Sequence, residues 1–254
     1  MILKRKIYKK LLEWKNECQG KKALLIEGAR RIGKSTICEE FGKNEYENYL
    51  LIDFAKKDKE VEMYFERYLN DLDTFFMLLQ THFGKKLTER NSLIIFDEVQ
   101  MFPQARAAIK YLVADGRYDY IETGSLISIR ENVKNIVIPS EERHINMYPL
   151  DFEEFAIALE EDLLVEYIKK CFEKREPLER SMHNQAMLLF HQYMLVGGMP
   201  MPVVAFIENK KDFTEADKEK RDILKLYRED IMKIDMRYRS KVLAIFDQIP
   251  GFLS

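Results

Sequence analysis

A glycine-containing loop carries the strongest chemical signal in the sequence. Residues 28–35 read GARRIGKS, which matches the pattern G-x-x-x-x-G-K-[ST]. Glycines let the backbone wrap a phosphate with its amides pointing inward, the lysine reaches the β- and γ-phosphates, and the serine hydroxyl binds Mg²⁺. An apolar run at 23–27 precedes the loop and a helix-forming stretch follows it, as this motif requires. We expect a nucleotide site formed by Gly28, Ala29, Arg30, Arg31, Ile32, Gly33, Lys34, Ser35 and Thr36.

Two adjacent carboxylates follow a second apolar run. Residues 92–96 read SLIIF, and Asp97 and Glu98 come directly after them. In a P-loop protein, such a strand end supplies the second half of the site. We expect Asp97 to hold Mg²⁺ together with Ser35, and Glu98 to orient and deprotonate the attacking water. Taken alone, the two residues are also consistent with acids that simply end a strand at the surface.

A third candidate lies where another apolar run ends, in the sequence Thr123-Gly124-Ser125. Ligands bind at the carboxyl ends of parallel strands, so a polar residue here is placed to sense the γ-phosphate. We expect Ser125 to take that role, with Thr123 as the second choice. The alternative is a turn without a ligand role, because turns favour these residue types.

An arginine that stabilises the transition state would decide between a working motor and a slow switch, since such a residue is worth roughly 10³–10⁵ in rate. No spacing rule separates the arginines that could supply it, and Arg143 is our first choice. The other candidates are Arg130, Arg228, Arg237 and Arg239.

Short apolar runs alternate with helical patterns in the first 150 residues. Strands are predicted at 23–27, 49–53, 92–97, 118–123 and 144–148, and helices at 5–18, after the loop, once or twice within 56–86, and at 103–116. Strands that are apolar on both faces indicate a parallel sheet covered by helices on both sides. The predicted fold is a three-layer α/β P-loop domain with sheet order 5-1-4-3-2.

The pattern changes after Pro149. Nearly everything from residue 151 onward is typical of helix, with breaks at Pro177, at 197–202 and near Asn209. We therefore predict a P-loop ATPase domain over residues 1–150 and a mostly α-helical domain over 151–254. The last residues read IPGFLS, which is typical of a turn and leads us to expect a truncated domain.

Composition gives no global electrostatic case for a nucleic-acid partner. The chain has 254 residues with 41 Lys and Arg against 43 Asp and Glu, a formal net charge of −2. Three scattered cysteines indicate neither a disulfide framework nor a zinc site, which favours the reducing cytoplasm. The four histidines lack ligand spacing, and no apolar stretch is long enough for a membrane span. We predict a cytoplasmic protein without a membrane contact.

Five motifs in order resemble those of prokaryotic AAA+-like P-loop ATPases. They are GARRIGKS at 28–35, LIIFDEVQ at 93–100, ETGSLIS at 122–128, MYPLDFEEF at 147–155 and LVGGMP at 195–200. The resemblance implies an N-terminal AAA domain, a helical segment and a C-terminal domain similar to restriction-endonuclease folds. It also implies ATP binding with slow hydrolysis, and makes Gln100 and residues 148–155 family signatures. The C-terminal domain would begin just after residues 247–250, where this sequence stops.

Three functions remain open at this stage. The first is Mg²⁺-dependent ATP hydrolysis. The second is a nucleotide-dependent switch with negligible turnover that regulates a partner or a DNA-associated process. A small-molecule kinase is disfavoured by Glu98 and by the lack of an arginine-rich lid segment. The guanine signature Asn/Thr-Lys-x-Asp does not occur within the predicted P-loop domain, residues 1–150, which favours ATP over GTP. A second copy of the chain or another protein is the expected macromolecular partner.

Overall fold

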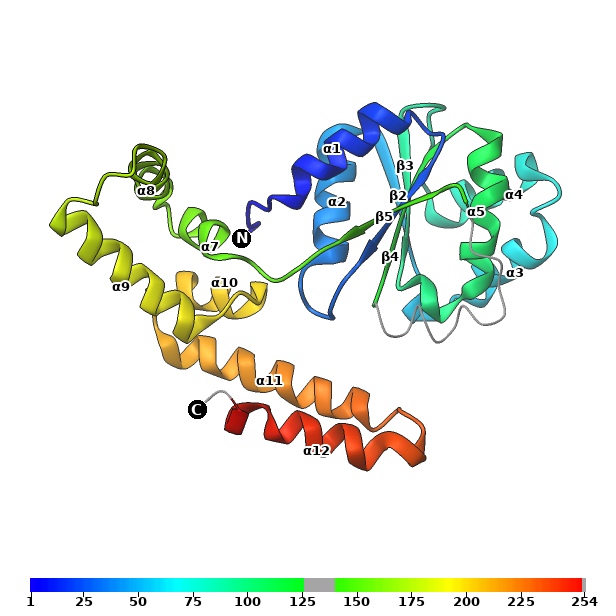
Figure 1. Ribbon diagram of the computed structural model, residues 1–254. Helices are drawn as coiled ribbons and strands as arrows, with labels where there is room; N and C mark the ends of the chain where they lie inside the picture. Colours follow the sequence, from blue (N-terminus) through cyan, green and yellow to red (C-terminus); the bar gives the residue numbers. More distant parts are fainter. Residues whose placement is uncertain (126–139, 253–254) are drawn as a thin grey trace. The chain divides into compact units, whose positions relative to one another are not determined.

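The computed structural model describes residues 1–125 and 140–252. The chain divides into two compact units, Leu3–Pro149 and Leu150–Ser254, the second of which includes Met1–Ile2. Figure 1 shows a strand-containing unit and an all-helical unit. The predicted assignment of these parts to an ATPase domain and a helical domain stays a prediction. Within the described ranges, no helix is long and apolar enough to cross a membrane.

The first unit is built on a five-stranded parallel sheet with the order β2-β3-β4-β1-β5, which confirms the predicted order. Its strands are β1 (Ala23–Glu27), β2 (Asn48–Asp53), β3 (Ser92–Asp97), β4 (Asp119–Gly124) and β5 (Glu142–Asn146). The register pairs Asp53 with Asp97 and Glu27 with Gly124, so the carboxyl ends of four strands lie along one edge. This edge carries the residues expected to bind nucleotide.

Helices cover both faces of the sheet (Figure 1). One layer holds α1 (Ile7–Cys18) and α2 (Lys34–Glu45), and the other holds α3 (Lys59–Arg67), α4 (Leu72–Phe83) and α5 (Pro103–Asp115). The larger core lies in the second layer, where rings of Phe54, Phe65 and Phe96 meet edge-on with centroids 5.6–5.8 Å apart. Aromatic packing of this kind adds to area burial and holds the sheet rigid beneath the site.

The first unit differs from the sequence-based prediction mainly in the bounds of β5, which runs over 142–146 and not 144–148. Pairing with β1 stops at Glu27 and Asn146, because β1 turns into the glycine-rich loop at the next residue. Glu142 begins the strand although its carboxylate is buried, since Arg106 on α5 neutralises it. A charged residue at a strand start gave the sequence pattern no apolar signal to detect.

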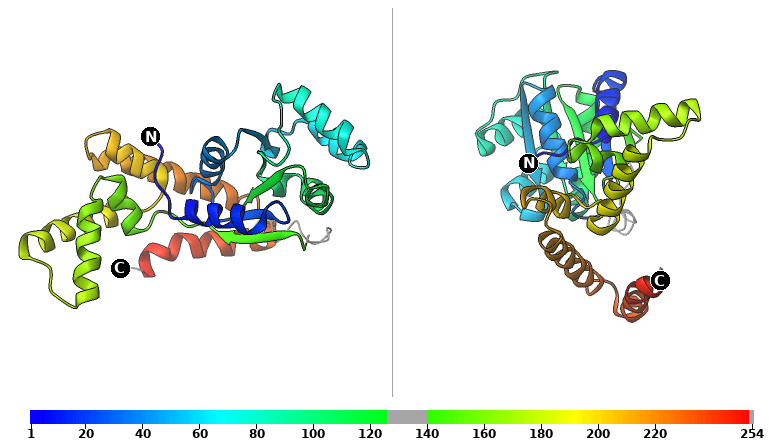
Figure 2. Two further views of the ribbon diagram at one scale, coloured as in Figure 1. Left: turned by 90° about the horizontal axis from the view of Figure 1, so that it is seen from above. Right: turned by 90° about the vertical axis from the view of Figure 1, so that its left-hand side faces the viewer.

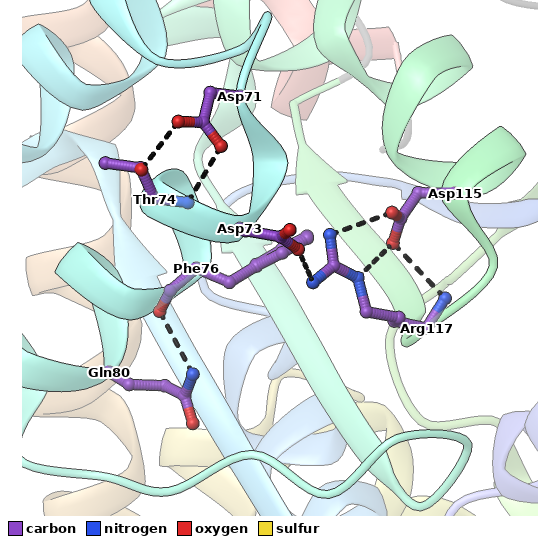
Figure 3. Close-up of polar contacts among 7 residues, drawn as sticks. All are labelled: Asp71, Asp73, Thr74, Phe76, Gln80, Asp115 and Arg117. Carbon is purple, nitrogen blue, oxygen red and sulfur yellow. Dashed lines mark hydrogen bonds and ion pairs between the residues drawn. The ribbon is translucent and has the colours of Figure 1, made fainter.

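The junction between α4 and β4 is fixed by one arginine (Figure 3). Arg117 donates from Nε and Nη2 to Asp115 at 2.8 and 2.9 Å, and from Nη1 to Asp73 at 2.7 Å. Its guanidinium also lies 4.7 Å from the centroid of Phe76. The two carboxylates raise the pKa of Arg117, with the hydrogen bonds to Asp115 as the largest contribution. These contacts attach α4 to the end of α5 and the start of β4.

The second unit is helical throughout its described residues. Its helices are α7 (Phe152–Ala158), α8 (Asp162–Lys174), α9 (Arg180–Val196), α10 (Pro200–Glu208), α11 (Phe213–Ile231) and α12 (Met236–Phe252). Asp151 begins α7 through a capping box with Glu154, in which each side chain accepts from the backbone amide of the other residue. Figure 2 shows α12 joined to α11 by a short turn, and Arg228 on α11 contacts Asp247 on α12 at 3.0 Å.

A close backbone contact joins the start of this unit to the end of α9. The amide of Leu150 donates to the carbonyl of Gly198 at 2.7 Å, and the Tyr193 hydroxyl donates to the Leu150 carbonyl at 2.9 Å. A Cβ on Gly198 would lie 2.1 Å from the Leu150 carbonyl oxygen, which no side chain allows. Gly198 is therefore required by the approach of two backbone segments, and not only as a break between helices.

Candidate functional site

The glycine-rich loop lies between β1 and α2, where its backbone adopts unusual angles. Gly33 has φ of +91° and Arg31 has φ of +66°, and Gly33 is the N-cap of α2. A glycine cap offers no side-chain acceptor to the first amides of the helix. Those amides and the positive end of the helix dipole favour an anion at this position.

Close packing against the end of β5 holds the loop in place. A Cβ on Gly28 would lie 2.4 Å from the carbonyl oxygen of Met147 and 2.5 Å from Cδ1 of Ile32, so only glycine fits there. Arg5 bridges the same two segments, because its guanidinium donates to the Ile32 carbonyl at 3.0 Å and to the Tyr148 carbonyl at 2.6 Å. No sequence pattern indicated this role, because Arg5 lies in a lysine-rich segment typical of a solvated helix face.

Lys34 is buried at the start of α2 and turns back over the loop. Its ammonium donates to the carbonyls of Gly28 and Ala29 at 3.1 and 2.9 Å. Burial lowers the pKa of Lys34, and the carboxylates of Glu98 and Asp97 oppose that shift. A buried ammonium needs anionic or carbonyl partners, so Lys34 favours an incoming phosphate group in this loop.

Asp97 is the residue on which the hydroxyls of the site converge. Ser35 donates from Oγ to both carboxylate oxygens of Asp97 at 2.8 Å, and Thr123 donates from Oγ1 to Oδ1. Asp97 and Thr123 end neighbouring strands and are both buried. The structure thus places residues from α2, β3 and β4 in direct contact. Ser125 comes two residues after Thr123, just beyond the end of β4, and is half-buried.

Glu98 has a left-handed backbone, with φ of +53° and ψ of +45°. A residue with a Cβ rarely adopts this conformation, which costs about 1–3 kcal/mol and is held only by its surroundings. The amide of Glu98 donates to Thr123 Oγ1 at 3.3 Å, and its carbonyl accepts from the amide of Met101 at 2.9 Å. Its carboxylate accepts from Nε2 of Gln100. Sequence reasoning noted Gln100 only through the family resemblance.

The oxygen ligands at this edge of the sheet suit a hard cation. A serine hydroxyl and an aspartate carboxylate are oxygen ligands, which Mg²⁺ prefers, and this ion commonly takes one or two protein ligands while waters and phosphates supply the rest. Among residues 1–125 and 140–252, no group of three or more His, Cys, Asp or Glu side chains could hold a metal on its own. Ser35 and Asp97 therefore fit a magnesium ion that is bound together with a nucleotide.

The other residues that were predicted for the site fall into two groups, those in or next to the loop and those away from it. Arg30, Arg31, Ile32 and Thr36 belong to the loop and the first turn of α2. Arg143 pairs in register with Leu24, near the amino end of β1, and forms an ion pair with Glu17 at 2.7 Å. The structure does not bring it to the Lys34 site of its own chain. Arg228 and Arg237 form ion pairs within the helical unit, Arg239 donates to the Ile234 carbonyl, and Arg130 lies outside the described residues.

The fold and this edge of the sheet define a P-loop nucleoside triphosphatase domain. A family model described as an AAA domain matches residues 20–156, which is more than half of the 254 residues. The chain belongs to this family of AAA domains, whose members are ATPase-like nucleotide-binding proteins.

Solved structures give more distant likenesses. PCH-2 of C. elegans is similar with a TM-score of 0.45 and 11% sequence identity, over 86% of this chain and 69% of that chain. The ORC1 protein of Aeropyrum pernix, solved in complex with DNA, is similar with a TM-score of 0.41 and 10% identity, over 99% of this chain and 74% of that chain. No curated protein sequence matches the chain.

Proposed function

We propose that this AAA domain binds ATP with Mg²⁺ and hydrolyses it slowly in isolation. The contact of Ser35 and Thr123 with Asp97, beside Lys34 and Glu98, supports this proposal most directly. A surface acid that merely ended a strand would be solvated, whereas Asp97 is buried and accepts from two hydroxyls. Those hydroxyls belong to residues far from it in the sequence.

Each residue has a distinct role in the proposed reaction. Lys34 exchanges its hydrogen bonds with the Gly28 and Ala29 carbonyls for phosphate oxygens. Ser35 and Asp97 would hold Mg²⁺, which when bound neutralises charge on the β- and γ-phosphates. Glu98 accepts the proton of the attacking water.

Phosphate release from Mg·ATP tests the proposal across a wide range of protein concentration. Lys34→Ala should abolish both ATP binding and turnover. Glu98→Gln should retain binding and lose about 10²–10⁴-fold in rate, the contribution of a positioned general base. Lys85→Ala is the matched control, because Lys85 also donates from Nζ to a backbone carbonyl, that of Tyr49 at 3.0 Å, but lies away from the loop.

The concentration series also tests for a second copy of the chain. Specific activity that rises with concentration supports a site completed by an arginine from a neighbouring copy, the role predicted for Arg143. ATP binding with turnover equal to that of Lys34→Ala would contradict hydrolysis and favour the nucleotide-dependent switch. Failure to bind ATP at all would contradict both.

A further inference from the structure

Gln100 contacts the carboxylate to which the proposed hydrolysis assigns the proton. It lies on the short 3₁₀ helix η2 (Val99–Met101), directly after β3, and its side chain is only 8% exposed. Its Nε2 donates to Oε2 of Glu98. The contact is between side chains two residues apart, which a regular helix would not bring together.

The backbone around Glu98 makes this contact available. The left-handed conformation of Glu98 ends β3 and begins η2, so that the two side chains turn toward each other. The amide of Glu98 is held by Thr123 and its carbonyl by Met101. Both backbone groups of Glu98 are held by hydrogen bonds, so rotation of its side chain is the motion that remains. The hydrogen bond from the Gln100 amide restricts this rotation.

A competing partner for Glu98 lies nearby. Burial lowers the pKa of Lys34, and the carboxylate of Glu98 opposes that shift more than the carboxylate of Asp97 does. A Glu98 side chain that moved onto Lys34 would neutralise the cation needed for phosphate and lose its own access to water. The Gln100 amide binds one carboxylate oxygen of Glu98 and leaves the other for a water molecule.

We propose that Gln100 is a positioning residue for Glu98, which keeps the carboxylate directed at water and away from Lys34. The proposal rests on the hydrolysis proposed above and deepens it. In this role Gln100 acts through Glu98 and not on the nucleotide. Its loss should therefore lower kcat while the affinity for ATP stays the same.

The test compares Gln100→Leu with wild type and with Gln80→Leu. Gln80 is the matched control: it is a half-buried glutamine on α4 whose Nε2 donates to the Phe76 carbonyl at 3.2 Å and whose Oε1 accepts from the Leu87 amide at 2.8 Å (Figure 3 shows the first contact). Three quantities are measured for each protein: kcat for Mg·ATP, Kd for a fluorescent ATP analogue, and the melting temperature. We expect Gln100→Leu to lower kcat at least about tenfold with Kd within about threefold, as part of the roughly 10²–10⁴ that a positioned base contributes. Gln80→Leu should leave kcat unchanged.

Combining Gln100→Leu with Glu98→Gln separates positioning from a general structural effect. If Gln100 acts through Glu98, the double variant turns over at the rate of Glu98→Gln alone. A further loss in the double variant, an unchanged or raised kcat in Gln100→Leu, or a loss of ATP affinity overturns the positioning role while leaving the proposed hydrolysis in place. Absence of Lys34-dependent turnover in wild type overturns both.

Discussion

The guanidinium of Arg106 and the carboxylate of Glu142 form two parallel hydrogen bonds inside the first unit. Nε donates to Oε1 at 3.0 Å and Nη2 donates to Oε2 at 2.8 Å, and the two side chains are 4% and 0% exposed. This bidentate geometry is the strongest arrangement that such a pair adopts. It joins α5 to the edge strand β5, whose carboxyl end supports the nucleotide loop.

Arg106→Met should reduce the free energy of unfolding by about 3–5 kcal/mol, because it leaves the Glu142 charge buried without its partner. Urea denaturation measures the change. Arg143→Met is the matched control, since Arg143 is the next residue along β5 and its ion pair with Glu17 is exposed. The control should cost no more than about 1 kcal/mol. Equal effects of the two substitutions would contradict the importance of the buried pair.

Glu122 should make stability depend on pH. It is fully buried on β4, and burial first and the charge of Glu142 second raise its pKa well above the ordinary value of 4.5, against the influence of Arg106. The folded protein thus keeps a proton that the unfolded chain releases. The stabilisation is complete below pH 4.5 and is lost as pH rises toward the raised pKa, by up to about 1.4 kcal/mol per pH unit.

Glu122→Gln removes this dependence, because glutamine does not titrate. The free energy of unfolding of wild type relative to this variant should fall steadily as pH rises from 5 toward 8, in urea denaturation at a series of pH values between about 5 and 8. A difference that stays constant over that range, or that grows in favour of wild type, would show that the native carboxyl is ionised.

Thr123 and Ser125 each carry a hydroxyl, and removing the two hydroxyls one at a time shows which of them turnover depends on. Thr123→Val keeps the side-chain shape but removes the donor to Asp97 and the acceptor for the Glu98 amide. Hydrogen bonds to charged groups are worth roughly 1.5–3 kcal/mol, so turnover of Mg·ATP should fall about ten- to hundredfold. Ser125→Ala should have a smaller effect. The reverse order would support Ser125 as the γ-phosphate sensor, which is the first choice from the sequence.

Four of the five strands could be located from the sequence because each is a short apolar run bounded by turn or helix signals, and the order of the sheet was expected from the P-loop domain that the motifs indicate. The contact of Ser35 with Asp97 also followed, since a P-loop and an acidic strand end belong to the same edge of a parallel sheet. Which of Thr123 and Ser125 contacts Asp97 could not be predicted from the sequence. Thr123 lies within β4, whereas Ser125 comes after Gly124, the last residue of that strand, and the packing of β3 against β4 decides which of the two meets Asp97.

Other parts of the site had no sequence signal at all. The left-handed backbone of Glu98 depends on hydrogen bonds from distant segments, and no residue type predicted it. Arg106 and Glu142 are 36 residues apart on different elements, and each alone is typical of a surface charge. Their pairing inside the fold depends on tertiary packing, which periodicity does not describe.

The contact of Gly198 with Leu150 has an evolutionary consequence. The segments around 150 and 198 are separate motifs in the sequence, yet the carbonyl of one occupies the space that a side chain of the other would need. A substitution in one segment at this contact therefore requires a compensating change in the other. In relatives of this chain, replacement of the glycine should be accompanied by a shift of the backbone at the start of α7, so that the two motifs are inherited or lost together.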